Sequence, residues 1–289
     1  MQLLARWDNT KVSTERLSFD RVQDVLDIGC GVGHWGQLQA HVLPKNARLH
    51  GVDREPIWIE KAASRAAARG LGDRFSYQTA IAEKLPFAEA CFDLVTCQTL
   101  LIHMADPGAA IDEMVRVARP GGLILAAESN NVASELLFDS VTFHDPIDEI
   151  VARVRLHLIC ERGKAVLGEG NNSIGDLVPS LFAKHGLHNI HVYLNDKTNV
   201  LLPPYDGDEQ RAMLEERADF KDCDFWIWSR EDTWRYFIAG GGSADDFDAL
   251  WSVAASGKSN AAIADRTYAA AGASIGYLVA GRKPQTRNA

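Results

Sequence analysis

The residues best suited to chemistry form a glycine-rich turn, VLDIGCGVGHWG, at positions 25–36. Such a turn after a strand lets the backbone approach a ligand closely, and the helix that follows offers free N–H groups. Read from Gly31, the spacing G-x-G-x-x-G matches a dinucleotide fingerprint in which a carboxylate such as Asp53 holds a ribose. Asp27 disfavours that interpretation, because a carboxylate at the strand end repels a pyrophosphate and suits an ammonium group.

The elements that must position this turn alternate between strands and helices up to about residue 130. Short apolar runs predict strands at 24–28, 48–53, 75–78, 92–97 and 123–128. Helical patterns with proline near the start or glycine after the end predict helices at 34–42, 56–69 and 106–118. Strands separated by such helices imply right-handed crossovers and a mostly parallel sheet.

Beyond residue 130 the alternation loosens. The pattern predicts helices at 146–163 and 174–185, a strand at 189–195 and a final strand at 274–280. Between the last two strands, the stretch 200–273 carries most of the tryptophans, including Trp226 and Trp228. We expect these aromatic side chains to cover a substrate, to form an auxiliary hydrophobic core, or to cage an amine through cation–π contacts.

A set of motifs extends the first turn into a recognisable pattern. The run Asp27-Ile28-Gly29-Cys30-Gly31-Val32-Gly33 strongly resembles the first motif of class I S-adenosylmethionine (SAM)-dependent methyltransferases. Further blocks follow in that family's order and at its usual spacing: GVD at 51–53, AEKLPF at 82–87, FDLV at 92–95, LIH at 101–103 and ARPGGL at 118–123. The resemblance is closest to the small-molecule subgroup that includes quinone-biosynthesis methyltransferases.

This resemblance implies an α/β fold, a doubly wound, mostly parallel, seven-stranded Rossmann-like sheet with an antiparallel last strand and a mainly helical cap. We expect residues 1–130, completed by 174–199 and 274–284, to form the SAM-binding core. The insertions 131–173 and 200–273 are then the cap that binds the substrate.

The resemblance also assigns the cofactor contacts. It places the first-motif glycines against the methionine part of SAM, Asp27 near the amino group, Asp53 on both ribose hydroxyls and the Ala82 N–H at the adenine. The predicted cofactor-binding residues are Asp27, Gly29, Cys30, Gly31, Gly33, Asp53, Ala82, Glu83 and Gln98. One position departs from the subgroup, which usually has an aspartate where this chain has Ile81. Recognition of the adenine amino group must therefore use Glu83, a backbone carbonyl or water.

The acceptor is less constrained than the cofactor. Because SAM carries an activated leaving group, methyl transfer to an O, N or C nucleophile needs mainly alignment and desolvation, and a general base helps some nucleophiles. His103 and His144 are the candidate bases by their positions after the fourth and fifth strands. An N/D-P-P-Y/F block, typical of enzymes that methylate nucleic-acid bases or glutamine, is missing at 97–100. A magnesium site would need carboxylate partners for Glu128, and none is evident, so we predict no metal.

Charge and composition limit the kinds of partner that the protein is expected to bind. The net charge of −9 disfavours nucleic acid, and the chain has no apolar run long enough for a membrane span. The first residues lack a signal-peptide pattern, which favours the cytoplasm. We expect a small-molecule substrate, and the oligomeric state stays open. The alternatives are a SAM-binding homologue without activity, which Ile81 favours, and an NAD(P)-dependent dehydrogenase.

Overall fold

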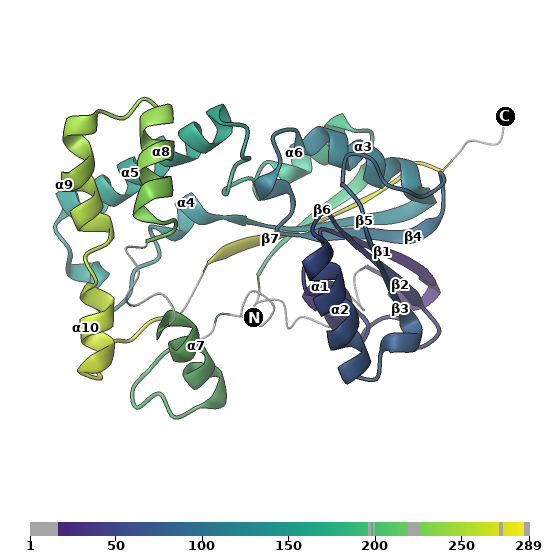
Figure 1. The fold of residues 1–289 in the computed structure, drawn as a ribbon, viewed down its shortest axis with the longest axis horizontal. Helices are drawn as coiled ribbons and strands as arrows, with labels where there is room; N and C mark the ends of the chain where they lie inside the picture. The colour runs from purple at the N-terminus through teal and green to yellow at the C-terminus, as the bar shows by residue number, and fades with distance from the viewer. Residues whose placement is uncertain (1–16, 196–197, 199, 219–225, 272–273, 286–289) are drawn as a thin grey trace.

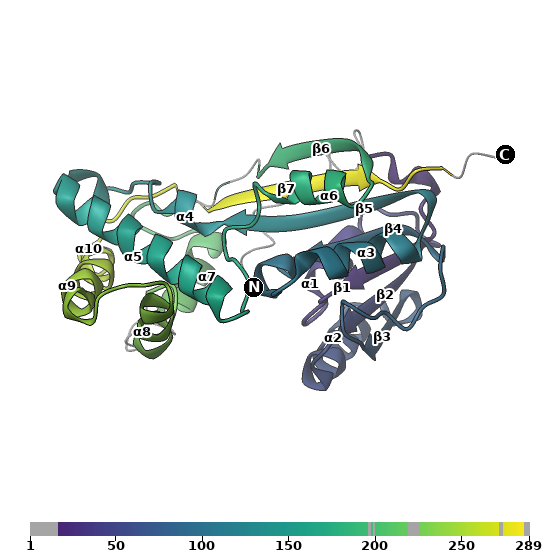
Figure 2. The same ribbon diagram turned by 90° about the horizontal axis from the view of Figure 1, so that it is seen from above.

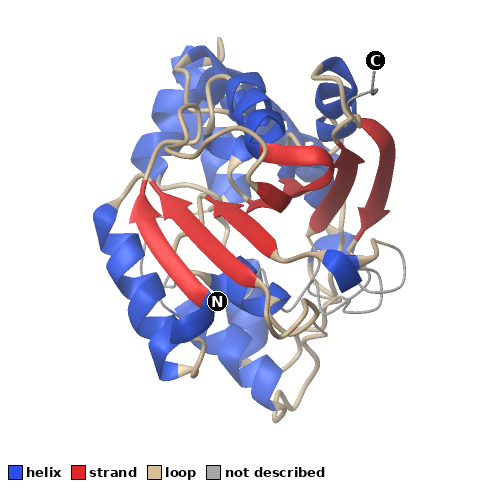
Figure 3. Ribbon diagram, turned by 90° about the vertical axis from the view of Figure 1, so that its right-hand side faces the viewer, coloured by secondary structure: helices blue, strands red, loops and turns tan. Residues whose placement is uncertain are grey.

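The computed structural model describes residues 17–195, 198, 200–218, 226–271 and 274–285. Seven strands form one sheet in the order β3-β2-β1-β4-β5-β7-β6. All neighbouring strands from β3 to β5 are parallel, whereas β7 runs antiparallel to both β5 and β6 (Figure 3). The strands are β1 (Asp24–Ile28), β2 (Arg48–Asp53), β3 (Phe75–Thr79), β4 (Phe92–Gln98), β5 (Ala118–Asn130), β6 (His188–Leu194) and β7 (Ile275–Arg282).

The helices fall into two groups, seen apart in Figures 1 and 2. Those beside the sheet are α1 (His34–Gln39), α2 (Pro56–Ala68), α3 (Pro107–Val117) and α6 (Val178–Lys184). Those beyond one end of the sheet are α4 (Asn131–Ser134), α5 (Ile147–Val166), α7 (Asp208–Ala218), α8 (Arg230–Ala239), α9 (Ala244–Ala254) and α10 (Lys258–Ala264). Short 3₁₀ turns include η5 (Leu101–His103) and η6 (Thr142–His144).

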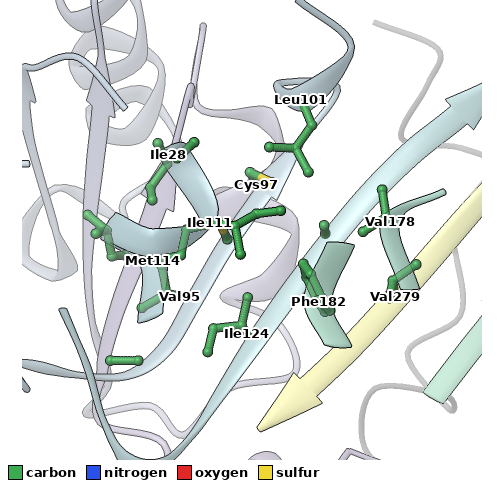
Figure 4. Packing of buried hydrophobic residues seen from close by; sticks show 14 of the residues in the cluster. Ile28, Val95, Cys97, Leu101, Ile111, Met114, Ile124, Val178, Phe182 and Val279 are labelled. Carbon is green, nitrogen blue, oxygen red and sulfur yellow. The ribbon is translucent and has the colours of Figure 1, made fainter. Parts of the chain in front are cut away.

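The central strands β1, β4 and β5 are buried on both faces, because alternate side chains point to opposite sides of the sheet and helices cover each side. On β5, Ile124 packs with Ile111 and Met114 of α3 and with Phe182 of α6 (Figure 4). Its neighbours on the strand pack in a second cluster that includes Trp35 of α1. Continuous apolar strands in the sequence are therefore the direct consequence of helices on both faces.

The predicted architecture is confirmed: a seven-stranded, mostly parallel sheet with an antiparallel last strand and a mainly helical cap. Element ends differ by a few residues. The strand expected at 123–128 runs from Ala118 to Asn130, because pairing with β4 begins at Phe92 and resumes after an irregularity. The helix expected at 174–185 starts only at Val178. The start of the chain, residues 1–16, lies outside the described residues.

The helices beyond the sheet have a hydrophobic core of their own. Leu156 and Cys160 of α5 pack with Tyr236 and Phe237 of α8 and with Trp251 of α9. These buried contacts join a segment that follows β5 to one that follows β6. The two insertions therefore pack as one unit, which we call the cap.

Close contact between α5 and α8 depends on a residue without a side chain. A Cβ atom added at Gly163 of α5 would lie 1.7 Å from the carbonyl oxygen of Tyr236 on α8. No real Cβ fits at that distance, so a larger residue must push the two helices apart.

We expect Gly163→Ala to lower the free energy of unfolding by about 1–3 kcal/mol or more, because overpacking displaces the backbone of both helices. Chemical denaturation would measure the loss. Gly72→Ala is the matched control, since the nearest atom to its added Cβ lies 3.8 Å away. Equal stability of the two variants would show that α5 and α8 are not in this contact.

Candidate functional site

A cavity of about 590 Å³ opens at the carboxyl ends of β1, β2 and β4. In open parallel sheets ligands bind at this edge, where the strand order reverses. The lining residues are Ile28, Gly29, Asp53, Arg54, Glu55, Trp58, Ala80, Ile81, Ala82, Glu83, Gln98, Thr99, Leu100, His103, Met104, Ala105 and Gly168. Six of the predicted site residues are among them: Gly29, Asp53, Ala82, Glu83, Gln98 and His103.

The glycine-rich turn leaves β1 in a conformation that other residues rarely adopt. Gly29, Gly31 and Gly33 have φ angles of 65°, 50° and 74°, all in the left-handed region. The turn is fastened to β2, because the Cys30 N–H donates to the Val52 carbonyl at 2.9 Å. Cys30 is buried, and Gly31 and Gly33 do not line the cavity, so of the glycines it is Gly29 that forms its wall.

Asp53 ends β2 and fixes the turn from the other side. Its Oδ2 accepts from the Gly31 N–H at 2.9 Å, and its Oδ1 accepts from the Glu55 N–H at 3.0 Å. A carboxylate has about four lone-pair sites, so each oxygen keeps capacity for one further donor. Asp53 can therefore shape the loop and still accept two hydroxyl groups from a ligand in the cavity.

Asp27 lies behind the turn, buried with 3% exposure. Its Oδ2 accepts from the Gly36 N–H at 3.0 Å, while its buried Oδ1 has no partner in the structure. Burial raises the pKa of Asp27 to about 7, although the Gly36 N–H lowers it, and the negative charge of Asp53 adds to the rise. A carboxyl group in this state gains most from a nearby cationic or hydrogen-bonding ligand group.

Gln98, the last residue of β4, carries a second buried polar atom that lacks a hydrogen-bond partner. Its Nε2 has no acceptor among the described residues, and the residue lines the cavity. A buried amide N–H without an acceptor costs free energy, and a ligand oxygen would remove that cost. Gln98 leaves one donor unmet at the cavity wall, and Asp27, which is not among the lining residues, leaves one acceptor unmet behind the glycine turn.

Apolar and aromatic side chains also line the cavity, together with the charged groups of Arg54, Glu55 and Glu83. Ile81 lines it with 51% of its surface exposed, beside Ala82. Trp58, in the first turn of α2, supplies an aromatic ring that sequence reasoning missed. Its place on the helix that follows Asp53 was the available signal, because the start of that helix faces the same edge of the sheet.

The turn that carries His103 is held by a buried carboxylate. Glu128 of β5 is 1% exposed, and its Oε1 accepts from the N–H groups of Leu100 at 3.0 Å and Leu101 at 2.9 Å. Burial raises the pKa of Glu128 to about 7, although the backbone donors lower it. Burial also lowers the pKa of His103, as do the positive charges of Lys164 and Arg54. His103 is therefore a neutral imidazole at pH 7, the form able to take a proton.

Glu128 thus supports the turn after β4. Asn130 is also engaged, because its Oδ1 accepts from the Ala133 N–H at the start of α4. Within the described residues, no group of three or more His, Cys, Asp or Glu side chains is arranged to hold a metal ion.

Other predicted features lie away from the cavity. His144 ends η6, is exposed and contacts the ring of Phe143. Trp226 and Trp228 pack with the cap core, each with its ring centroid 5.4 Å from that of the buried His157. Of the three roles considered for these tryptophans, the structure places them in an auxiliary core.

Comparison with known proteins identifies one segment of the chain. Residues 25–122 match the family model of the methyltransferase domain. The segment runs from β1 to the start of β5 and holds every predicted cofactor-binding residue. The cap lies outside it.

Curated relatives match over a similar part of the chain. Methyltransferase GfsG from Streptomyces halstedii is 37% identical over 114 residues, which cover 39% of this chain and 40% of that protein. A probable chloroplastic tocopherol O-methyltransferase from Oryza sativa subsp. japonica is 34% identical over 119 residues, covering 38% of this chain and 32% of that protein. The chain therefore matches less than half the length of these relatives.

Solved structures share the fold at low identity. The YcgJ protein from Bacillus subtilis superposes with a TM-score of 0.53 at 17% identity, over 96% of this chain and 98% of that one. The [4+2]-cyclase SpnF superposes with a TM-score of 0.50 at 19% identity, over 96% of this chain and 80% of that one. The Rossmann-like fold is common to both, and it does not by itself decide the reaction.

The raised pKa of Glu128 predicts a pH dependence of stability. A carboxyl whose pKa is higher in the folded chain stabilises the fold below its unfolded value, and that contribution is lost as pH rises through the folded value of about 7. Glu128→Gln keeps an oxygen that can accept from the turn but cannot ionise. We expect its free energy of unfolding to fall less than that of the wild type between pH 4.5 and 8, by at most about 3 kcal/mol. Parallel curves from denaturation across this range would contradict the assignment.

Proposed function

We propose that this protein is a SAM-dependent methyltransferase that acts on a small molecule. One observation carries the proposal: the cavity joins Gly29, Asp53, Ala82 and Gln98 inside the segment that matches the methyltransferase domain. The names of the relatives, which include a tocopherol and a ubiquinone O-methyltransferase, support a small acceptor of the quinone or phenol type.

The residues present fit SAM. The unpaired Oδ1 of Asp27 and the unpaired Nε2 of Gln98 are complementary to an amino-acid group, which carries one ammonium and one carboxylate. Asp53 retains acceptor capacity for the ribose hydroxyls, and Ile81, Ala82 and Trp58 form an apolar end for adenine. Ile81 occupies the position where the subgroup usually has an aspartate, so Glu83 or the backbone must accept the hydrogen bond of the adenine amino group.

The chain's own contribution to the reaction is alignment and proton removal. Bound SAM supplies a methyl group on a sulfonium leaving group. Gln98 and the glycine turn hold the amino-acid end, and the cavity walls exclude water from the reacting atoms. His103 is proposed to take the proton that a hydroxyl or ammonium acceptor loses, because its lowered pKa keeps it neutral. His144 stays a second candidate base, although it is not part of the cavity lining.

We propose the following division of the chain. Residues 1–130, with 174–199 and 274–284, form the cofactor-binding core, and the segments 131–173 and 200–273 form the substrate cap. Among the described helices, none combines the length and apolar character needed to cross a bilayer. A cytoplasmic location and the lack of a nucleic-acid partner stay predictions from the sequence.

Two experiments separate the proposal from its alternatives. Calorimetry with S-adenosylhomocysteine (SAH) and with NADH distinguishes SAM binding from a dehydrogenase, and tight NADH binding without SAH binding would overturn the proposal. Release of labelled methyl from SAM onto a panel of phenols, quinols and amines distinguishes an enzyme from a binding protein. SAH binding with no transfer to any class would favour the non-catalytic homologue.

The role of Asp53 gives a quantitative prediction. Asp53→Ala removes the acceptor for two ribose hydroxyls and the support of the Gly31 N–H. We expect SAH to bind about tenfold to a hundredfold more weakly, since hydrogen bonds to a charged group contribute roughly 1.5–3 kcal/mol each before partial compensation by water. Asp73→Ala, which removes an exposed carboxylate next to β3, should leave the Kd unchanged. A change below twofold in Asp53→Ala would place the ribose elsewhere.

The state of Asp27 predicts proton release on binding. With a pKa of about 7, the free protein holds roughly half a proton on Asp27 at pH 7, and a bound ammonium group would displace it. Calorimetry of SAH binding in buffers of different ionisation enthalpy should show release of up to about half a proton at pH 7. Asp27→Asn should abolish the release. Equal release in both proteins would mean that Asp27 does not face the amino group.

A further inference from the structure

The turn η5, which carries His103, is hydrogen-bonded from two sides by buried ionisable side chains, one acidic and one basic. From the sheet, the Glu128 carboxyl group accepts hydrogen bonds from the N–H groups at the start of the turn. From the cap, the Lys164 ammonium of α5 donates to the Ile102 carbonyl at 3.2 Å. Lys164 is 4% exposed, so this contact lies in the interior between cap and core.

Lys164 also binds the loop that follows α5. Its Nζ donates to Oδ1 of Asn172. The carboxylate of Glu161, one turn earlier on the helix, accepts from the Asn172 N–H at 2.9 Å and from the Ser173 hydroxyl at 3.1 Å. Residues 168–173, which we call the wall loop, are therefore anchored to α5 by a buried cation and a buried anion.

The wall loop reaches the cavity at one place and the His103 turn at another. Gly168 is a cavity-lining residue, and a Cβ added to it would lie 3.8 Å from the Cβ of Ala105. Gly170 has a φ of 89°, and a Cβ added there would lie 2.2 Å from the Ile102 carbonyl oxygen. The loop therefore touches the turn at the same carbonyl that Lys164 holds.

The far end of this network lies in the cap core. His157 is fully buried, with Nδ1 3.2 Å from Glu135 and Nε2 3.2 Å from Glu161. Burial lowers the pKa of His157, but the two carboxylates outweigh it, and the net shift is upward. In the protonated form both ring nitrogens donate, and the imidazolium then holds Glu161 oriented toward the wall loop.

We propose that Lys164 is a positioning residue for the part of the cavity that His103 and Gly168 line, which we call the acceptor end. It fastens the wall loop to the His103 turn and thereby fixes the cavity wall and the environment of the imidazole. The term acceptor end rests on the proposed function. The fastening itself does not, because it concerns contacts within this chain.

The charge of Lys164 adds a measurable consequence. Burial is the main cause that lowers the pKa of His103, and the cations Lys164 on α5 and Arg54 after β2 lower it further. The negative groups that Lys164 faces are Glu161 and Glu169. Removal of the ammonium should therefore raise the pKa of His103, whereas loss of a distant charge on the same helix should not.

The experiment compares Lys164→Met, which keeps the length of the side chain without its charge, with Arg162→Met, which removes an exposed charge two residues earlier. NMR titration, with the His103 signal assigned by means of His103→Gln, measures the effect of the charge on the pKa of His103. Hydrogen exchange of the amides of 168–173 measures how firmly the wall loop is held. Calorimetry with SAH measures the affinity of the cofactor site. In Lys164→Met we expect an upward shift of the His103 titration, at least tenfold faster exchange in the wall loop and a Kd for SAH within about threefold of the wild type. Arg162→Met should match the wild type in all three.

Asn172→Ala provides a second route if Lys164→Met does not fold, because it removes a partner of the ammonium and leaves the charge. It should speed exchange in the wall loop. Unchanged exchange in the wall loop, in whichever of the two variants folds, would overturn the proposal, and so would an unchanged His103 titration in folded Lys164→Met. Failure of the wild type to bind SAH would overturn the proposed function alone, since the titration and the exchange need no cofactor.

Discussion

The parallel pairing of β1 between β2 and β4 is the constraint on which the site depends. Its register sets Ile28 opposite Val52 on one side and opposite Cys97 on the other. The next residue along each strand is then Gly29, Asp53 or Gln98, and all three line one cavity. Three positions separated by as many as 69 residues meet because backbone hydrogen bonds allow one alignment, and a slip of one residue would move every side chain of the strand to the opposite face of the sheet.

Carboxylates at this edge of the sheet satisfy N–H groups of the turns that the strands do not reach. After β4, the Thr99 N–H still donates to the Ala127 carbonyl of β5, and Glu128 accepts from the next two N–H groups, those of Leu100 and Leu101. The turn after β1 uses Asp53 in the same way. Each carboxylate replaces a missing strand contact and leaves a loop defined well enough to hold a ligand.

The sheet and the glycine-rich turn could be predicted from the sequence because the patterns that mark them lie within short stretches of chain. Apolar runs between glycines and prolines mark the strands, and the block from Asp27 to Gly33 identifies the turn whose three glycines have positive φ. The cap was predicted only as mainly helical, since its packing depends on pairs far apart in the chain, such as Gly163 with Tyr236. The tryptophans show the limit most clearly. Composition allowed Trp226 to face a substrate, a core or an amine, and only its contact with His157 places it in the cap core. Lys164 carried no signal, because nothing in its neighbours predicts a contact with Ile102.

The place of β7 has a consequence for the order in which the chain is assembled. β7 lies between β5 and β6, although it is the last strand in sequence. During synthesis β6 therefore has no edge to join until residues 275–282 leave the ribosome, and the whole stretch 200–271 emerges before that happens. The cap helices must wait or fold beside an open sheet, with the apolar edge of β5 exposed in the meantime. Such a nascent chain has the unpaired strand edge on which chaperones act and from which aggregation starts.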